Sequence, residues 1–308
     1  MTFLYKSDAV RGRVWQEIFA QRAPQLDFRI WPDMADPKRV RFIAAWSLPP
    51  LDPNDYPNLE VVFCTGAGID KLGVAQIPSH LKVVRMIEPG LTAGMVEYVT
   101  LAVLSLHRDW HAFAAQQRAQ VWRELPVLPA NIRCVGVMGL GELGAAVAGA
   151  IRSLGFKCVG WSRSPKQVQG VRCFHGAEGL DAFLAACDYL VCLLPLTAET
   201  RGVLDRRLFA KLPRGAAVIN VGRGAQLVQE DLLAALDEGQ LGAAILDVCE
   251  PEPLPAGHPL WSHPRVVITP HIASETQPCT AAPAVLDNLE RHERGEAMVG
   301  LVDRVRGY

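Results

Sequence analysis

The stretch VGVMGLGELGAAVAGAIRSLGF, residues 135–156, decides how this chain folds. A run of apolar residues typical of a buried strand ends at Gly139, and an alanine-rich helical pattern begins just beyond it. Gly139, Gly141 and Gly144 stand in G-x-G-x-x-G spacing. The first glycine permits a tight turn, the second lets the backbone approach a pyrophosphate, and the third lets helix and strand pack closely.

A dinucleotide is the ligand that this strand–loop–helix unit predicts. The helix N-terminus presents unbonded N–H groups and a positive partial charge, both of which favour a phosphate. We therefore expect the cofactor to contact Gly139, Gly141, Glu142, Leu143 and Gly144. Because the chain has 26 glycines, the spacing alone could arise by chance, and three turn glycines without a ligand are the alternative.

The residues on either side of this unit alternate between strand-like and helix-like patterns. Continuous Val/Ile/Leu runs such as YLVCLLP, 189–195, are typical of parallel strands that are buried on both faces. The alternation predicts an α/β fold with two blocks, each a parallel sheet covered by helices. The tail 279–308 is too small to be a domain, and we expect it to pack on the first block.

Two helices can be placed from the sequence with some detail. Residues 9–22 predict an amphipathic helix whose buried face carries Val10, Val14, Ile18 and Phe19. Residues 94–120 predict one long helix that precedes the second block.

Composition excludes several classes of protein. The formal net charge is −1 and no run of Lys or Arg is present, so we expect neither a nucleic-acid nor a membrane partner. The eight cysteines form no C-x-x-C pair, which favours free thiols in a reducing cytoplasm and no metal site. No apolar run approaches the roughly 20 residues of a membrane helix, and no secretory signal is expected.

The segment GWSRSPK, residues 160–166, bears on the choice of cofactor. An acid that binds the adenosine ribose of NAD usually stands at the end of this second strand, but Ser162 holds the place here. Arg163 and Lys166 follow, and a 2′-phosphate would meet attraction rather than repulsion. We therefore predict NADPH as the preferred cofactor, with NADH possible; the alternative is that the cations cover a solvated turn.

Three charged side chains follow three later strands. Arg223 comes after INVG, Glu252 after ILDV, and His271 after VVITP. Ligands of open α/β sheets bind beyond the carboxyl ends of the strands, so these side chains can converge on one site. Taken singly, Arg223 could be a loop cation and Glu252 a solvated acid.

These residue types fit the reduction of a 2-keto acid by hydride transfer. An Arg fork can bind the carboxylate and polarise the carbonyl, and a protonated His can donate to the oxygen as negative charge develops. A carboxylate on the other ring nitrogen fixes the tautomer and favours the charged imidazolium. We assign substrate binding to Arg223, acid–base catalysis to His271, and support of the imidazole to Glu252.

Longer motifs extend this pattern over nearly the whole chain. GLGELG, LPRGAAVINVGRGAQLVQEDLLAAL, LDVCEPEPLP and HPLWSHPRVVITPHIAS resemble the D-isomer-specific 2-hydroxyacid dehydrogenases. TGAGID, GMVEYV, GWSRSPK and the terminal VDRVRGY are similar to the glyoxylate/hydroxypyruvate reductase A branch of that family.

The resemblance implies two Rossmann-like doubly wound domains, a cytoplasmic homodimer built through the cofactor domains, and specific site residues. A smaller, flavodoxin-like substrate domain is expected from 1–98 plus 279–308, with the cofactor domain, 99–278, inserted in it. The catalytic set is again Arg223, Glu252 and His271. Further cofactor-binding positions are Leu194, Pro195, Thr200, Val221, Gly222, Asp247 and Ser274, and substrate-binding positions are Ala67 and Gly68 beside Arg223 and His271. Trp46, which follows the strand-like run VRFIAA, is a further substrate-binding candidate, and packing in the core of the small domain is its alternative role.

The activity implied is NADPH-dependent reduction of glyoxylate and hydroxypyruvate to D-2-hydroxy acids. The segments KLGVAQIPSHLKVV and RMIEPGLTAGMVEY depart from the branch, so a bulkier keto acid, of the phenylpyruvate or branched-chain type, is the second candidate. A corepressor-like module that senses NAD(P)(H) without catalysis is the third.

Overall fold

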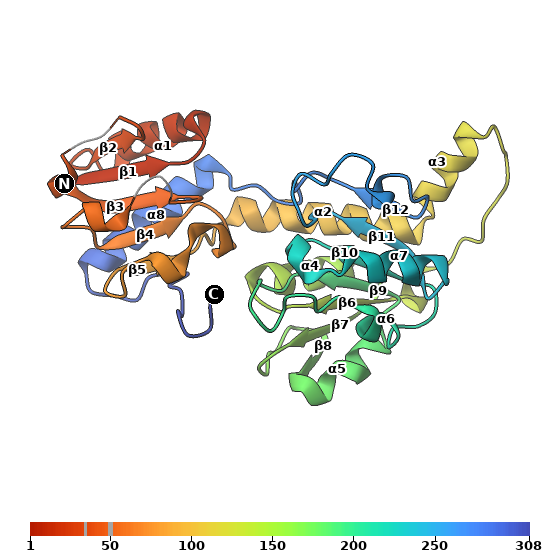
Figure 1. The fold of residues 1–308 in the computed structure, drawn as a ribbon. Coiled ribbons are helices and arrows are strands. Elements are labelled where there is room, and N and C mark those ends of the chain that lie inside the picture. Colours follow the sequence, from red (N-terminus) through yellow and green to blue (C-terminus); the bar gives the residue numbers. More distant parts are fainter. Residues whose placement is uncertain (34–35, 49–51) are drawn as a thin grey trace. The chain divides into compact units, whose positions relative to one another are not determined.

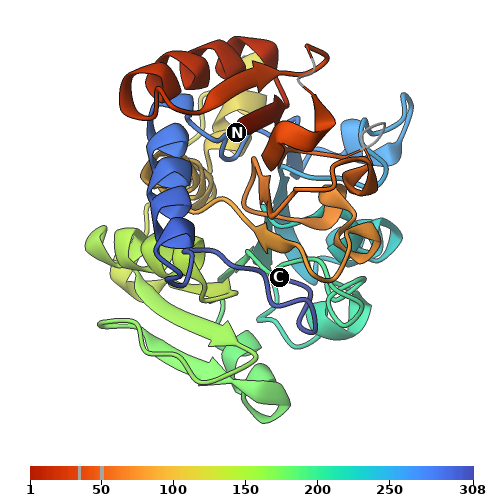
Figure 2. The ribbon, with the colours of Figure 1, turned by 90° about the vertical axis from the view of Figure 1, so that its left-hand side faces the viewer.

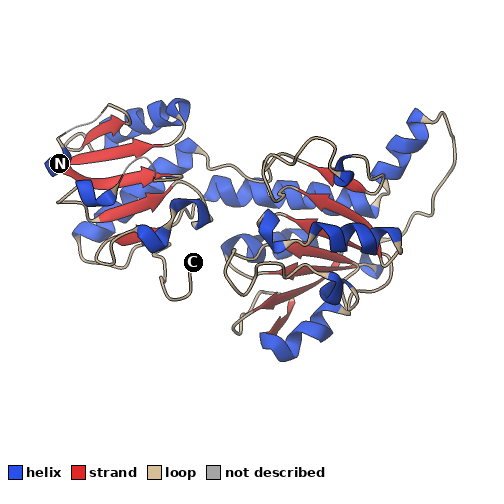
Figure 3. Ribbon diagram, in the orientation of Figure 1, coloured by secondary structure: helices blue, strands red, loops and turns tan. Residues whose placement is uncertain are grey.

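The computed structural model describes residues 1–33, 36–48 and 52–308, and these divide into two compact units (Figures 1 and 3). The first unit comprises Met1–Thr92 and Glu275–Tyr308, and the second comprises Ala93–Ser274. The second unit is therefore an insertion in the first. The assignment of substrate binding to the first unit and of cofactor binding to the second stays a prediction.

The first unit is built on five parallel strands. They are β1 (Thr2–Lys6), β2 (Asp27–Ile30), β3 (Val40–Ala45), β4 (Val61–Cys64) and β5 (Lys82–Val84). Their order is β2-β1-β3-β4-β5, which is the flavodoxin-like order, and it confirms the fold that the family resemblance implies for this part of the chain. All five carboxyl ends lie at one edge of the sheet.

Alternate residues of these strands enter two separate cores. Phe3, Phe42 and Phe63 point to the face covered by α1 (Ala9–Arg22) and α8 (Pro278–Glu293), which pack against each other. Leu4, Ile43 and Val62 point to the opposite face, under the loops that connect the strands. Burial on both faces explains why these strands read as continuous apolar runs.

The buried face of α1 differs in part from the predicted one, because Phe19 is buried and Ile18 packs against the core as predicted but Val10 does not. Gly12, Trp15 and Phe19 are buried, whereas Val10 is 63% exposed. Trp15 and Phe19 contact the ring of Phe3. The large aromatic rings, which fill the space over the sheet, set the rotation of the helix in place of the smaller valines.

The second unit is built on seven parallel strands. They are β6 (Cys134–Met138), β7 (Lys157–Ser162), β8 (Arg172–His175), β9 (Tyr189–Cys192), β10 (Ala216–Asn220), β11 (Leu241–Leu246) and β12 (Val266–Ile268). Their order is β12-β11-β10-β9-β6-β7-β8. This is the doubly wound order of dinucleotide-binding sheets, and it reverses between β6 and β9.

Helices cover both faces of this sheet (Figure 3). On one face lie α2 (Pro89–His107), whose first turn belongs to the first unit, and α4 (Glu142–Ser153). On the other lie α5 (Gly176–Leu184), α6 (Arg206–Phe209) and α7 (Gln229–Asp237). Short 3-10 turns span Pro37–Arg39, Pro53–Asp55, Asp70–Leu72, Val74–Gln76, Ala130–Ile132, Gly224–Gln226 and Pro259–Trp261.

The long helix predicted over 94–120 is in fact two helices. The first, α2, ends at His107, and α3 (Trp110–Arg118) follows after a break. Asp109 has a φ of 50°, a left-handed conformation that Asp tolerates better than most residues and that cannot continue an α-helix.

The expectation that no segment is apolar enough to cross a membrane also needs correction. Among the described helices, α2 alone has the length and composition of a membrane span. Its residues Met95, Val99 and Val103 are buried in the core of the second unit. The apolar character of α2 therefore supplies packing surface for the sheet.

Candidate active site

The glycine loop has the geometry that its spacing predicts. Gly139 has a φ of 111°, and a Cβ there would lie 2.7 Å from the carbonyl oxygen of Leu193. A Cβ on Gly144 would lie 1.8 Å from the carbonyl oxygen of Gly139, so only glycine lets α4 start this close to the loop. A Cβ on Gly141 would meet nothing within 4 Å. The loop is thus closed towards the sheet and open at Gly141, which fits a phosphate group at the N-terminus of α4.

The turn after β9 lies beside this loop, where the strand order reverses. Thr200 donates from Oγ1 to the carbonyl oxygen of Pro195 at 2.6 Å. Gln226 donates from Nε2 to the carbonyl oxygens of Leu194 and Pro195 at 2.9 and 3.1 Å. Three of the predicted cofactor positions therefore belong to one hydrogen-bonded turn, whose shape also depends on Gln226.

The turn after β7 separates buried from exposed side chains. Ser162 is 8% exposed and donates from Oγ to the carbonyl oxygen of Ser164 at 2.8 Å. A hydroxyl has one proton to donate, so Ser162 uses it within the turn. Arg163 and Lys166 are exposed, and they are the charged groups that this turn presents.

The backbone N–H and carbonyl groups of Arg223 are both hydrogen-bonded to side-chain amides. Its N–H donates to Oε1 of Gln226 at 2.8 Å, and its carbonyl oxygen accepts from Nδ2 of Asn220 at 3.1 Å. Both partners are fully buried, and Gly222 also donates to Oδ1 of Asn220 at 3.2 Å. The position of the arginine at the end of β10 is therefore set by two buried amides.

The loop after β11 packs directly on Gly224. A Cβ on Gly224 would lie 1.9 Å from the carbonyl oxygen of Cys249. The N–H of Cys249 donates in turn to Oε1 of Glu252 at 3.2 Å. Close backbone contact thus joins the loop that carries Arg223 to the loop that carries Glu252.

His271 and Glu252 form a pair. Nδ1 of His271 lies 3.0 Å from Oε2 of Glu252, and both side chains are 32% exposed. A carboxylate only accepts hydrogen bonds, so Nδ1 carries the proton in this contact and Nε2 remains for a ligand. Arg223, Glu252 and His271 follow β10, β11 and β12, which are neighbours in the sheet.

Asp247 organises the backbone around His271. Asp247 is only 2% exposed. Its carboxylate accepts hydrogen bonds from Oγ1 of Thr269 and from the N–H groups of Ile272 and Ala273, at 2.7–2.8 Å. Its carbonyl oxygen accepts from the N–H of His271 at 2.8 Å. His271 has a φ of 58°, a strained conformation that persists only where the surroundings impose it. The predicted contact of Asp247 with the cofactor stays a prediction.

Tyr98 of α2 supports the same loop. Its hydroxyl lies 2.5 Å from Oγ1 of Thr269. Burial raises the pKa of Tyr98 to about 12, so the hydroxyl stays protonated. Since Thr269 donates its proton to Asp247, Tyr98 is the donor to Thr269. Neither residue stands out in the sequence, because a Tyr in a helix and a Thr after a strand are ordinary core and surface residues.

In the first unit, Trp46 and the TGAGID loop follow β3 and β4. The ring of Trp46 packs on Gly66, where a Cβ would lie 2.3 Å from a ring carbon. The carbonyl oxygen of Gly68 accepts from Sγ of Cys64 at 3.3 Å. The N–H groups of Ala67 and Gly68 have no partner among the described residues. This loop therefore offers two donors to an anion, as the sequence predicts.

Two remaining cofactor positions lie in the second unit. Val221 is buried, and its N–H donates to the carbonyl oxygen of Cys192. Ser274 lies against Gly94, where a Cβ would come within 2.9 Å of the serine Oγ. Across residues 1–33, 36–48 and 52–308, no group of three or more His, Cys, Asp or Glu side chains could hold a metal ion.

Residues 100–273 match the NAD binding domain of the D-isomer specific 2-hydroxyacid dehydrogenases. The chain belongs to this family. The matched residues lie inside the second unit, so the glycine loop, Arg223, Glu252 and His271 all belong to the region that defines these dehydrogenases.

Individual dehydrogenases match over their full length. The chain is 38% identical to glyoxylate/hydroxypyruvate reductase A of Yersinia enterocolitica, with all of both chains covered. A D-isomer specific 2-hydroxyacid dehydrogenase of Xanthobacter autotrophicus, solved with NADPH and MES, is 42% identical with a TM-score of 0.94 and 99% of each chain covered. The NADPH-dependent glyoxylate/hydroxypyruvate reductase of Sinorhizobium meliloti, solved with NADP and sulfate, is 35% identical with a TM-score of 0.91, covering 100% of this chain and 99% of that one.

Proposed function

We propose that the chain is an NADPH-dependent reductase of small 2-keto acids, glyoxylate and hydroxypyruvate among them, and that it forms D-2-hydroxy acids. The observation that carries the proposal is the 3.0 Å contact between His271 and Glu252. Glu252 follows β11, which is the neighbour of β10, the strand that Arg223 follows. Family membership and the names of the full-length relatives support the substrate class.

Arg223, His271 and Glu252 have separate roles in the proposed reaction. The nicotinamide cofactor, when bound, supplies the hydride. Arg223 binds the carboxylate of the keto acid and polarises its carbonyl group. His271 donates a proton from Nε2 to the carbonyl oxygen as negative charge develops, while Glu252 holds the ring and stabilises the imidazolium.

The first unit offers two backbone donors to a carboxylate. The N–H groups of Ala67 and Gly68 bind it as a pair of donors, and Trp46 packs behind the loop and shapes the pocket for the substrate side chain. A panel of 2-keto acids, assayed by optical measurement of NADPH consumption, tests this substrate class. Good turnover of phenylpyruvate together with poor turnover of glyoxylate and hydroxypyruvate would contradict the proposal for small substrates.

The preference for NADPH rests on Arg163 and Lys166. Both side chains are exposed on the turn where NAD-specific relatives of the fold place an acid. Reversing the charge in Arg163→Glu should lower kcat/KM for NADPH by about tenfold or more relative to NADH, because a charge-assisted pair becomes a repulsion. Arg207→Glu, the same change at an exposed position of α6, should leave the ratio unchanged.

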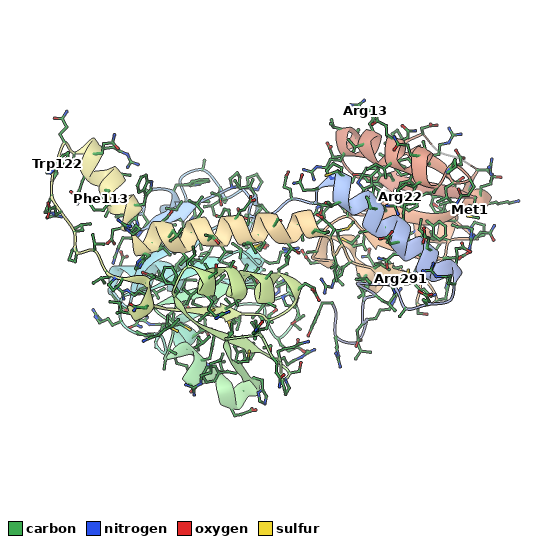
Figure 4. The ribbon with its side chains drawn as sticks, turned by 180° about the vertical axis from the view of Figure 1, so that it is seen from behind. Met1, Arg13, Arg22, Phe113, Trp122 and Arg291 are labelled. Carbon is green, nitrogen blue, oxygen red and sulfur yellow. The ribbon has the colours of Figure 1, made fainter. Side chains whose placement is uncertain are left out.

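A homodimer formed through the second unit completes the proposal. An arm made of α3 and residues 119–129 exposes large apolar side chains, with Trp110 69%, Trp122 98% and Val127 73% exposed (Figure 4). Several large apolar side chains exposed on one segment are typical of a protein interface. Sedimentation should show a dimer for the natural chain and a monomer for Trp122→Lys.

The compartment proposed is the cytoplasm. All eight cysteines are free thiols, and most of them are buried. Free thiols persist where the medium is reducing. Cell fractionation with an antibody against the chain tests this.

A further inference from the structure

The C-terminal tail of the chain makes contacts that the proposed catalysis does not use. After α8 ends at Glu293, the chain passes beside β5 and ends near the loop that joins β4 to β5 (Figures 1 and 2). All of these parts belong to the first unit. The loop begins with TGAGID, to which we assign the substrate carboxylate.

The tail is fixed first to α8 and then to β5. The buried side chain of Asn288 accepts from the N–H of Val299 at 2.7 Å and donates to its carbonyl oxygen at 3.0 Å. The carbonyl oxygen of Gly300 then accepts from Arg85 at 2.9 Å, and the N–H of Val302 donates to Val83 at 2.9 Å. The tail therefore lies along the outer side of β5 as a short antiparallel partner.

Arg304 then reaches into the loop. Its guanidinium donates to the carbonyl oxygens of Ile77, Pro78 and Leu81 at 2.8–2.9 Å and, more weakly, to that of Val74 at 3.4 Å. The carbonyl oxygens of Val74 and Pro78 also accept from the N–H groups of Ile77 and Leu81 in short turns, so the guanidinium adds a second donor there. A planar fork with five donors is suited to several acceptors at once.

The other end of the loop is held through the same strand. Met86 donates its N–H to the carbonyl oxygen of Gly66 at 3.0 Å, and Arg85, the residue before it, is bonded to Gly300 of the tail. Ile69 and Leu72, between the two anchor points, are buried in the core. The tail thus restrains the loop at Gly66 through β5 and at 74–81 through Arg304.

We propose that Arg304 is a positioning residue for substrate binding, which keeps the N–H groups of Ala67 and Gly68 in place for the carboxylate of the keto acid. The inference rests on the function proposed for that loop. Arg304 touches neither Ala67 nor Gly68, and it acts by fixing the backbone that follows them.

The test compares Arg304→Met with Arg306→Met in the full-length enzyme. Arg306 lies two residues further on, has a side chain that is 66% exposed, and pairs with Asp303 in the tail itself. Arg304→Met should raise KM for glyoxylate between about 10- and 100-fold, the range expected for a shift of roughly 1 Å in a binding group. Its Kd for NADPH should stay within about twofold, since the restraint lies in the other unit, while Arg304→Lys should recover part of the loss because one ammonium still bonds some of the carbonyls.

Hydrogen exchange of residues 66–81 supplies a readout that needs no substrate. Arg304→Met should speed exchange there, and Arg306→Met should not. The inference is overturned if Arg304→Met leaves hydrogen exchange of residues 66–81 unchanged. It is also overturned if exchange becomes faster in this variant but its KM for glyoxylate does not change. A natural enzyme that reduces no 2-keto acid refutes the proposed function instead, and exchange still tests the restraint.

Discussion

Replacement of Gly224 by alanine should damage catalysis without touching a catalytic side chain. The new Cβ would lie 1.9 Å from the carbonyl oxygen of Cys249, 2.0 Å from its carbonyl carbon and 2.7 Å from its Cα. A carbon and an oxygen that are not bonded approach to about 3.3 Å, so the two backbones must separate by roughly 1.4 Å. Neither neighbour can rotate away, because both belong to the main chain.

The separation moves Arg223 away from Glu252 and His271. Gly224 follows Arg223 directly, and Cys249 is bonded to Glu252. A misplacement of about 1 Å costs roughly 100-fold in rate, so kcat/KM for glyoxylate should fall by about that factor. Overpacking should also lower the free energy of unfolding by about 1–3 kcal/mol.

Steady-state assays and thermal unfolding measure both effects, with Gly149→Ala as the control. A Cβ on Gly149, inside α4, would meet nothing within 4 Å, so this variant should keep its activity and gain about 0.8–1.0 kcal/mol of stability. If Gly224→Ala keeps kcat/KM within threefold of the natural enzyme, the coupling of the two loops is refuted, whatever happens to Tm.

Three further predictions concern buried groups. Asp247→Asn should reduce kcat about 100-fold with a smaller change in KM, measured with glyoxylate, because an amide cannot accept all the bonds that position the loop of His271. Gln226→Leu should lower the free energy of unfolding, measured with urea, by about 1–3 kcal/mol for each partner left unsatisfied. Cys279 is exposed, whereas burial raises the pKa of Cys158 to about 12, so a thiol reagent at pH 8 should modify Cys279 much faster than Cys158; fast reaction of Cys158 would contradict the buried core.

The sequence was most informative where local chemistry and position in the sheet coincide. The glycine loop, the strand ends at Arg223 and His271, and the two parallel sheets follow from apolar runs punctuated by glycines. In such sheets the end of each strand is a predictable place for a functional side chain. The contact between His271 and Glu252 is therefore one that the amino-acid sequence alone predicts.

Features that depend on distant partners could not be predicted in this way. The role of Gln226 depends on carbonyls about thirty positions earlier in the chain, and that of Arg304 on a loop more than two hundred positions earlier. In the sequence both look like polar surface residues. The helix break at Asp109 comes from a left-handed backbone conformation that hydrophobic periodicity does not reveal. The rotation of α1 towards Trp15 comes from packing in an aromatic core, which periodicity does not reveal either.

The central claim is that His271, held by Glu252, protonates the substrate during hydride transfer. The most direct measurement is kcat for NADPH-dependent glyoxylate reduction by His271→Asn, together with Kd for NADPH from fluorescence. Asparagine tolerates the positive φ of this position, so the loop should keep its shape. We expect kcat to fall about 10²–10⁴-fold while Kd stays within about twofold. A His271→Asn enzyme with nearly natural kcat would contradict it.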